Sequence, residues 1–305
     1  MRIFVAGATG VLGRRVVPAL VDRGHAVTGV ARSADKADQL RAQRATPASV
    51  DLFDPAAVTA AVDGNDVVIN LATSIPPTSR MLRPSAWRTN DRLRTEASRH
   101  LVNAAPQTGA ERHVQEALAF IYPESGAAWI DEDVPPDAPS SVDAVLSAEA
   151  QVHRFAAGGG SGVVLRFGLF YSADSAQTRD MLTLIRRGLL PQAGANEAYQ
   201  SWVHVDDAAA AVVAALDVGS GTYNVVEDDP LTNAEHTRVL SELVGRRVRR
   251  LPRVAGVGPL AFQARSQRVS NRRLCGATSW RPAFGSRRDG WTQVANAARH
   301  VITGA

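Results

Sequence analysis

Three glycines near the amino terminus constrain this chain more than any other feature. Gly7, Gly10 and Gly13 follow a short apolar run, Arg2 to Ala6, that predicts a buried strand. The next residues, Val11 to Arg23, carry apolar side chains at helical spacing. A strand, a glycine-rich turn and a helix in this order predict a dinucleotide-binding turn, because residues without Cβ let the backbone turn tightly and approach a diphosphate. The helix amino terminus then offers unpaired N–H groups to the phosphates.

The following residues repeat the alternation of strand and helix. Apolar or β-branched runs at 26–31 and 67–72 predict strands, and residues 34–44 and 55–62 between them predict helices. Ser33 and Asp54 are the predicted amino-terminal caps of these two helices. Helices that alternate with buried strands indicate βαβ units and a parallel sheet. The predicted fold class is therefore α/β, a Rossmann-type doubly wound parallel sheet.

The remaining chain predicts further elements and a second, smaller unit. The expected elements are helices over 87–105 (ending before Pro106), 142–157, 178–187, 206–216 (capped by Asp206) and 233–244, and strands over 113–121, 163–167, 201–205 and 222–226. We assign residues 1–170, completed by about 201–226, to a dinucleotide-binding domain. Residues 171–200 and 227–305 form a smaller C-terminal substrate lobe in this interpretation. Its aromatic and apolar residues are expected to cover a cleft together; they are Leu260, Phe262, Trp280, Phe284 and Trp291.

Composition excludes several classes of protein. Of 305 residues, 45% are hydrophobic and 21% are charged, which excludes a disordered chain because enough apolar surface is available to offset chain entropy. The only cysteine, Cys275, excludes an internal disulfide, disfavours structural zinc and fits a cytoplasmic location. No run approaches the roughly 18 apolar residues of a membrane span. No cluster with metal-ligand spacing is present in the sequence.

The basic character of the chain comes from arginine. The net charge is +4, and of 34 basic residues all but Lys36 are arginine, which keeps its proton to very high pH and so raises the isoelectric point. The basic stretch Arg246 to Arg253 is interpreted as a solvated face, with binding of an anion or nucleic acid as the alternative. We expect no nucleic-acid partner, no membrane partner, a small-molecule substrate, and a monomer or homodimer.

The residue after the second predicted strand bears on which dinucleotide binds. An acidic residue there would hydrogen-bond the ribose 2′-hydroxyl of NAD, whereas an arginine suits a 2′-phosphate. This chain has Arg32, so NADP(H) is favoured over NAD(H), with a solvated strand end as the alternative. Arg14, Ser33 and Lys36 are candidates to add to the phosphate contacts.

Several motifs resemble the extended branch of the short-chain dehydrogenase/reductase superfamily, the branch of NAD(P)-dependent epimerases and dehydratases. They are the glycine spacing, Val67 to Ala72, Asn90, Val164 to Tyr171, Trp202 to Asp207 and Tyr223 to Val225. The resemblance covers about residues 1–295. It implies that the end of 67–72 lies under the cofactor ribose and that 164–171 passes the nicotinamide. The expected cofactor contacts are Gly7, Thr9, Gly10, Val11, Leu12, Gly13, Arg32, Asp51, Leu52, Leu71, Ala72, Thr73, Phe167 and Gly168.

The chain departs from this family at its catalytic residues. The resemblance implies a Ser or Thr, a Tyr, and a Lys four residues after the Tyr, where the lysine lowers the pKa of the tyrosine. No tyrosine here has lysine at that spacing. The tyrosine and lysine positions fall on Val142 and Leu146, or one residue earlier on Ser141 and Val145, and the serine position falls on or near Leu118. The chain therefore resembles an atypical member that lacks the usual acid–base set.

Other residues are candidates for the missing chemistry. Tyr122 is the first candidate proton donor, and strand alternation over 113–121 predicts that Glu116 shares its face. A half-buried aromatic and a structural glutamate are the alternatives. Arg166 and Tyr171 flank the turn near the nicotinamide and are candidates to bind substrate, although Arg166 equally suits a structural ion pair.

These features lead to one main hypothesis and two alternatives. The main hypothesis is an NADP(H)-dependent oxidoreductase acting on a small carbonyl or enone, with Tyr122 or bound water as the proton donor. The first alternative is a non-catalytic NADP(H)-binding sensor or regulator, favoured by the loss of the tyrosine and lysine. The second is a non-redox isomerase or cyclase that uses the same cleft.

Overall fold

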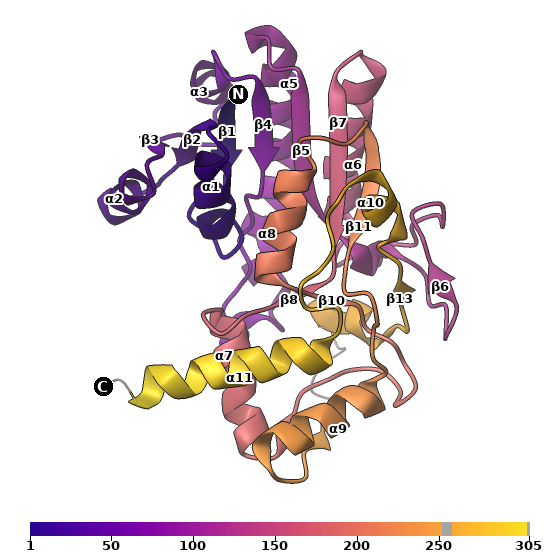
Figure 1. Ribbon diagram of the computed structural model, residues 1–305. Coiled ribbons are helices and arrows are strands. Elements are labelled where there is room, and N and C mark those ends of the chain that lie inside the picture. The colour runs from indigo at the N-terminus through magenta and orange to yellow at the C-terminus, as the bar shows by residue number, and fades with distance from the viewer. Residues whose placement is uncertain (252–257, 304–305) are drawn as a thin grey trace.

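A seven-stranded sheet forms the centre of the computed structural model, which describes residues 1–251 and 258–303 (Figure 1). The strand order is β11-β7-β5-β4-β1-β2-β3, and every neighbouring pair is parallel. These strands are β1 (Arg2–Ala6), β2 (Ala26–Val30), β3 (Thr46–Ala48), β4 (Val67–Asn70), β5 (Arg112–Leu118), β7 (Ser161–Phe167) and β11 (Gly221–Val225). The order reverses between β1 and β4, so the predicted doubly wound parallel sheet is confirmed. Sheets of this class bind ligands at that switch point, outside the carboxyl ends of the strands.

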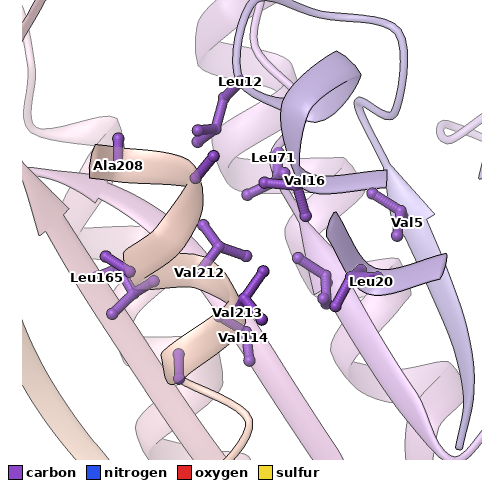
Figure 2. Close-up of a cluster of buried hydrophobic side chains, with 14 of the residues drawn as sticks. Val5, Leu12, Val16, Leu20, Leu71, Val114, Leu165, Ala208, Val212 and Val213 are labelled. Atoms are coloured by element: carbon purple, nitrogen blue, oxygen red, sulfur yellow. The ribbon is translucent and has the colours of Figure 1, made fainter. Parts of the chain in front are cut away.

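Helices cover both faces of the sheet. They are α1 (Gly13–Asp22), α2 (Ala34–Ala42), α3 (Pro55–Val62), α4 (Arg88–Arg92), α5 (Ser98–Thr108), α6 (Ala144–Ala157), α7 (Ala176–Arg186), α8 (Val205–Ala214), α9 (Asn233–Val244), α10 (Arg272–Ala277) and α11 (Arg287–Thr303). One buried core joins α1 and α8 to the sheet, and Figure 2 shows Val16 of α1 and Val212 of α8 in it. A second core joins α3, α5 and α6 to the opposite face. Burial of these apolar faces supplies the main stabilisation of the sandwich.

Local capping signals correctly predict the starts of α2 and α3. The side chain of Ser33 accepts a hydrogen bond from the backbone N–H of Lys36 in α2. Asp54 accepts from the backbone N–H groups of Ala56 and Ala57 in α3. Each cap satisfies N–H groups that the first helical turn leaves unpaired.

Three local predictions are wrong. Helix α5 continues through Pro106 to Thr108, because Ala104 and Ala105 are packed in the second core and the proline disturbs only the last turn. Helix α8 begins at Val205 and is capped by His204, whose side chain accepts from the N–H of Asp206; Asp206 itself is inside the helix.

The third wrong prediction concerns the strand that was expected to reach residue 121. Strand β5 ends at Leu118, and a 3₁₀ turn (Ala119–Ile121) follows. The alternation of faces therefore stops before Tyr122, so the expectation that Tyr122 shares a strand face with Glu116 is wrong.

Short strand pairs and three helices lie beyond the carboxyl ends of the main sheet. The pairs are β6 (Trp129–Ile130) with β13 (Arg268–Val269), β8 (Leu169–Tyr171) with β10 (Trp202–His204), and β9 (Leu189–Leu190) with β12 (Arg249–Arg250). Figure 1 shows α7, α9 and α11 below the end of the sheet toward which the β4 arrow points. They enclose a third core that includes Tyr171, Leu182 and Trp291.

The aromatic residues expected to cover a cleft together are divided among separate clusters. Trp280 belongs to the core of α1 and α8, and its indole N–H donates to the carbonyl of Asp207. Phe262 packs on Phe120 in the second core. Trp291 lies in the core beyond the sheet. Within the described residues, no helix combines the length and the hydropathy that crossing a bilayer requires.

Candidate cofactor and active site

The glycine-rich turn between β1 and α1 has the geometry that a diphosphate requires. Gly7 has φ of +78°, and a Cβ on it would overlap the carbonyl of Leu71. A Cβ on Gly13 would overlap the carbonyl of Gly7. The N–H of Gly10 donates to the Gly7 carbonyl at 3.0 Å, which closes the turn. Helix α1 has no side-chain cap at Leu12, so no cap hydrogen bond occupies the first N–H groups of the helix, which an anion would meet there. These residues therefore fit a dinucleotide diphosphate.

The residues at the end of β2 fit a second phosphate. Arg32 is exposed and forms no ion pair or side-chain hydrogen bond with the residues that the structure describes. Ser33 and Lys36 lie in the adjoining first turn of α2, where the Lys36 ammonium contacts Gln39 at 3.4 Å. Arg14, in contrast, forms an ion pair with Asp174 at 2.8 Å, so in this structure its charge is already matched.

The other expected cofactor residues occupy different environments. Asp51 is exposed and accepts a hydrogen bond from the N–H of Phe53, whereas the side chain of Leu52 is buried in the second core. Leu71 is buried beside Gly7, Thr73 is exposed, and Phe167 is fully buried. The chain thus brings the glycine turn and the end of β4 into direct contact. The remaining expected contacts are Thr9, Val11 and Ala72, which are half-buried, and Gly168, on which a Cβ would lie 2.7 Å from the carbonyl oxygen of Ser201.

Tyr122 is held in a buried polar network. Its hydroxyl donates to Oδ1 of Asn224 at 2.9 Å and accepts from Nη1 of Arg166 at 2.8 Å. Arg166 also donates two hydrogen bonds to the carboxylate of Glu149, at 2.8 and 2.7 Å. Burial raises the pKa of Tyr122 to about 12, although Arg166 opposes the shift. Arg166 therefore forms a structural ion pair, which is its alternative interpretation. The Tyr122 hydroxyl both donates to and accepts from buried residues of the protein.

Glu116 is part of a different buried pair. Its carboxylate lies 3.0 Å from Nη2 of Arg94, and both side chains are almost completely buried. Burial raises the pKa of Glu116, and the charge of Arg94 opposes this shift. Arg94 comes from a π-helical turn (Leu93–Ala97) between α4 and α5. No local pattern indicates this partner, because a single arginine in an amphipathic helix is normally solvated.

The positions that carry the acid–base set in the resembled family are apolar here. Val142 and Val145 are buried, and Leu118 and Leu146 are partly buried against the second core. At Ser141, the hydroxyl oxygen is buried and has no hydrogen-bond partner among the described residues. Apart from Ser141, these positions therefore hold apolar side chains, rather than a carboxyl, phenol or ammonium group, where the resemblance places the acid–base set.

Tyr171 lies in the core beyond the sheet, away from solvent. Its ring stacks on Trp291 with centroids 5.7 Å apart, and it meets His204 edge-on at 5.2 Å. A Cβ on Gly290 would overlap the Tyr171 hydroxyl, so α11 passes directly over the ring. Burial raises the pKa of this phenol. The residue is fully buried, which does not favour direct contact with substrate.

Two polar clusters near the expected cofactor were missed by sequence reasoning. Asp174, after β8, contacts both Arg14 and Arg15 at the start of α1. Burial raises the pKa of Asp174, but hydrogen bonds from Arg15 and Ser172 outweigh it and hold the pKa at about 2. The second cluster supports the end of β4: Asn70 donates to Ser98 and Gln115 and accepts from the N–H of Ala72. Both link positions far apart in sequence, which no local pattern reports.

The predicted basic stretch is mostly exposed, and the described residues contain no candidate metal site. Arg246, Arg247 and Arg249 are exposed, which agrees with a solvated face, while Arg250 donates to the carbonyl of Ala193 and Arg253 lies outside the described residues. Among residues 1–251 and 258–303, no group of three or more His, Cys, Asp or Glu residues could hold a metal ion.

Known proteins resemble this chain in sequence. The model of the NAD dependent epimerase/dehydratase family matches residues 3–225. A 3-diazoavenalumate denitrifying reductase from Streptomyces sp. is 35% identical over 308 residues, which cover 95% of this chain and 99% of that protein. The match therefore extends through the carboxy-terminal region.

Solved structures match the whole chain as well. A UDP-glucose 4-epimerase with UDP-glucose from Thermotoga maritima has a TM-score of 0.81 and 19% identity, covering 99% of this chain and 100% of that chain. A UDP-glucose 4-epimerase in complex with NAD from Thermus thermophilus has a TM-score of 0.76 and 22% identity, covering 98% and 99%. At these identities the likeness concerns the fold.

Proposed function

The chain belongs to the NAD dependent epimerase/dehydratase family, and we propose that it is an NADP(H)-dependent reductase whose hydride acceptor needs no acid from the protein. One observation carries the proposal. The residues that would cradle the dinucleotide are intact, whereas apolar side chains, Leu118, Val142 and Val145, stand where the acid–base set is expected. A hydride acceptor that requires a protein acid is therefore disfavoured.

The charges at the end of β2 support the phosphorylated cofactor. Arg32 is exposed and unmatched among the described residues, and the cap residue Ser33 and Lys36 lie within the next turn. A 2′-phosphate at this position would accept charge-assisted hydrogen bonds from these groups and from the amino terminus of α2. NAD would leave the Arg32 guanidinium without an anionic partner. We therefore propose NADP(H) as the cofactor.

The apolar site narrows the kind of group that is reduced. Reduction of a carbonyl produces an oxyanion, which an enzyme normally protonates or stabilises. A diazonium group leaves as dinitrogen and requires no such donor. The Streptomyces relative is named a denitrifying reductase of a diazo compound. We propose the same class of acceptor here, a carbon that bears a diazonium group.

The reaction balances with one reduced cofactor per substrate. The bound cofactor would supply a hydride; the C–H bond would form as the C–N bond breaks, with the C–N electron pair leaving on dinitrogen and NADP⁺ as the other product. The chain's own task would be to orient the two reactants and to exclude water. Leu118, Val142 and Leu146, which are apolar and buried in or packed against the second core, would provide the apolar surroundings for this. Exclusion of water also protects a diazonium carbon from hydrolysis.

The proposal is tested with 4-carboxybenzenediazonium and NADPH deuterated on the transferred position. We expect one dinitrogen per NADPH oxidised, and deuterium at the ring carbon that carried nitrogen. The same mixture without protein, and with Gly13→Ala, gives the background rate. Dinitrogen release without deuterium transfer would contradict the proposal.

Two other candidates have distinct outcomes in the same assay. The first is reduction of a small carbonyl or enone, with bound water as the proton donor; oxidation of NADPH by a carbonyl panel but not by the diazonium ion would establish it. A regulator that binds the cofactor without turnover is favoured by the absence of a paired tyrosine and lysine. It would oxidise NADPH with neither class and would bind NADPH and NADP⁺ with clearly different affinities.

A further inference from the structure

We propose that the segment after β4 binds the carboxylate of an elongated, otherwise apolar substrate, mainly through Arg80 and Arg83. This segment, residues 73–88, is called the strap below. The inference rests on the proposed function, because it names the kind of molecule that the same site would reduce. It adds a recognition element outside the glycine turn.

The charge of the strap is unbalanced. It carries three arginines, Arg80, Arg83 and Arg88, and the sequence has no acidic residue from 73 through Asn90. All three side chains are exposed, and none forms an ion pair or side-chain hydrogen bond with the residues that the structure describes. By contrast, Arg92, just after the strap, is paired with Glu96 at 2.8 Å. The strap therefore presents guanidinium groups that have no anionic partner among the described residues.

The strap also exposes apolar side chains. Ile75 is 42% exposed and Leu82 is 48% exposed, and they are two of only five large hydrophobic side chains that are more than a third exposed among the described residues. Single exposed apolar residues are ordinary, but two on one segment that also carries unpaired arginines make that segment amphipathic. Such a surface matches a ligand with an apolar body and an anionic end.

The position of the strap connects it to the expected active site. It begins directly beyond β4, where Ser74 N–H donates to Oδ1 of Asn90, so its start is fixed on α4. Farther along, the Thr78 hydroxyl donates to Oδ2 of Asp180 in α7 at 2.6 Å. The strap therefore extends from the carboxyl edge of the sheet to α7. The indole N–H of Trp87 donates to the carbonyl of Met81, which holds its middle turn.

The apolar residues at the expected catalytic positions explain why the substrate carboxylate would bind at the strap. The residues at the expected catalytic positions, Leu118, Val142 and Leu146, are apolar and suit an aromatic or unsaturated body. A carboxylate buried among them would lose its hydration without compensation. A guanidinium offers a planar pair of N–H donors that matches a carboxylate. The anionic end of the substrate is therefore expected at Arg80 and Arg83.

The test measures binding to the protein saturated with NADP⁺. Calorimetric titrations use benzoate, trans-cinnamate and 4-hydroxycinnamate as carboxylate probes, methyl cinnamate as the uncharged match, and UDP-glucose as the diphosphate alternative. We expect trans-cinnamate to bind, and methyl cinnamate to bind about 10-fold more weakly or worse, because a charge-assisted hydrogen bond is lost. The double variant Arg80→Gln/Arg83→Gln should bind acid and ester equally.

Controls separate this inference from the proposed function. Arg246→Gln/Arg247→Gln removes two exposed arginines elsewhere and should leave the discrimination unchanged. Both double variants should bind NADP⁺ within about twofold of the parent, since exposed surface changes away from packed features rarely matter. If NADP⁺ binds but no carboxylate does, or acid and ester bind alike, or UDP-glucose binds instead, the carboxylate inference is overturned alone. If NADP⁺ itself fails to bind, the proposed function falls and the inference falls with it.

Discussion

The hydroxyl of Tyr122 accepts a hydrogen bond from Nη1 of Arg166 at 2.8 Å. Its own proton is donated to Asn224, and both partners are buried. A phenol in this arrangement with a pKa of about 12 holds its proton at neutral pH and directs it into the protein. The network joins β7, β11 and, through Glu149, helix α6. Its evident role is to lock these elements together beside the expected active site.

Tyr122→Phe tests this structural role. We expect the free energy of unfolding to fall by about 1–3 kcal/mol, because Arg166 and Asn224 lose a buried partner. Turnover of a diazonium substrate should change by less than about threefold, since no proton is transferred in that step. Urea denaturation and single-turnover kinetics check the two quantities.

The matched control is Tyr223→Phe. This hydroxyl makes one hydrogen bond, to the carbonyl of Gly219, and lies on β11 of the same sheet. Its loss should cost about 1 kcal/mol or less. A large loss of kcat in Tyr122→Phe with unchanged stability would reinstate the tyrosine as the proton donor.

Gly13→Ala should abolish cofactor binding. A Cβ at this position overlaps the carbonyl of Gly7, so the turn must open and the first N–H groups of α1 no longer point at the diphosphate. We expect NADPH affinity to fall by about 100-fold or more, as measured by fluorescence titration. Gly276→Ala in α10 is the control, because a Cβ there meets nothing within 4 Å and alanine favours a helix. Equal affinities in the two variants would show that the turn does not bind the diphosphate.

Arg32→Asp should reverse the cofactor preference. The aspartate repels a 2′-phosphate and accepts a hydrogen bond from a free ribose hydroxyl. We expect NADPH affinity to fall by roughly 30-fold or more, with NADH affinity unchanged or improved. Arg99→Asp makes the same charge change at an exposed position of α5 and should alter neither affinity much. A similar loss for both cofactors in Arg32→Asp would argue against a 2′-phosphate at this residue.

His113 should make folding stability depend on pH. It is completely buried in β5, and burial lowers its pKa from 6.5 to about 4. The unfolded chain therefore binds a proton between about pH 6.5 and 4 that the folded chain does not bind, so stability falls as the pH is lowered through this range. The full effect of the shift is about 3 kcal/mol.

A variant isolates this contribution. His113→Leu removes the titrating ring, and its unfolding free energy should fall less steeply between pH 6.5 and 4 than that of the parent. His153→Leu makes the same substitution at an exposed histidine and serves as the matched control. Parallel curves for His113→Leu and the parent, from urea denaturation at each pH, would show that His113 does not titrate as its burial requires.

Local patterns in the sequence were sufficient for most of the fold. Asp54 followed by Pro55 specifies the start of α3, because the cap and the proline both act within one turn. Pro106 misled the prediction for the opposite reason: tertiary packing of Ala104 and Ala105 maintains the last turn of α5. The end of β5 was also missed, since nothing in Ala119 to Ile121 marks a break from extended structure.

The candidate site was predictable only in part. The glycine turn and Arg32 could be found because the residues that cofactor binding requires there are close together in the sequence. The partners of Glu116 and Arg166 could not, since Arg94 and Glu149 are 22 and 17 residues away in sequence. Pairing across such separations depends on how the helices pack on the sheet. The absence of a lysine four residues after any tyrosine was visible in advance, because it depends only on which residue types are present.

Trp280 has a consequence for engineering this chain. The family match ends at residue 225, yet this indole packs in the core of α1 and α8 and bonds to the Asp207 carbonyl. Truncating or grafting the protein at the apparent boundary would remove Trp280 from this core and leave a cavity about the size of its side chain. Chimaeras with relatives should retain residues 272–280 together with the amino-terminal half, as one inseparable block.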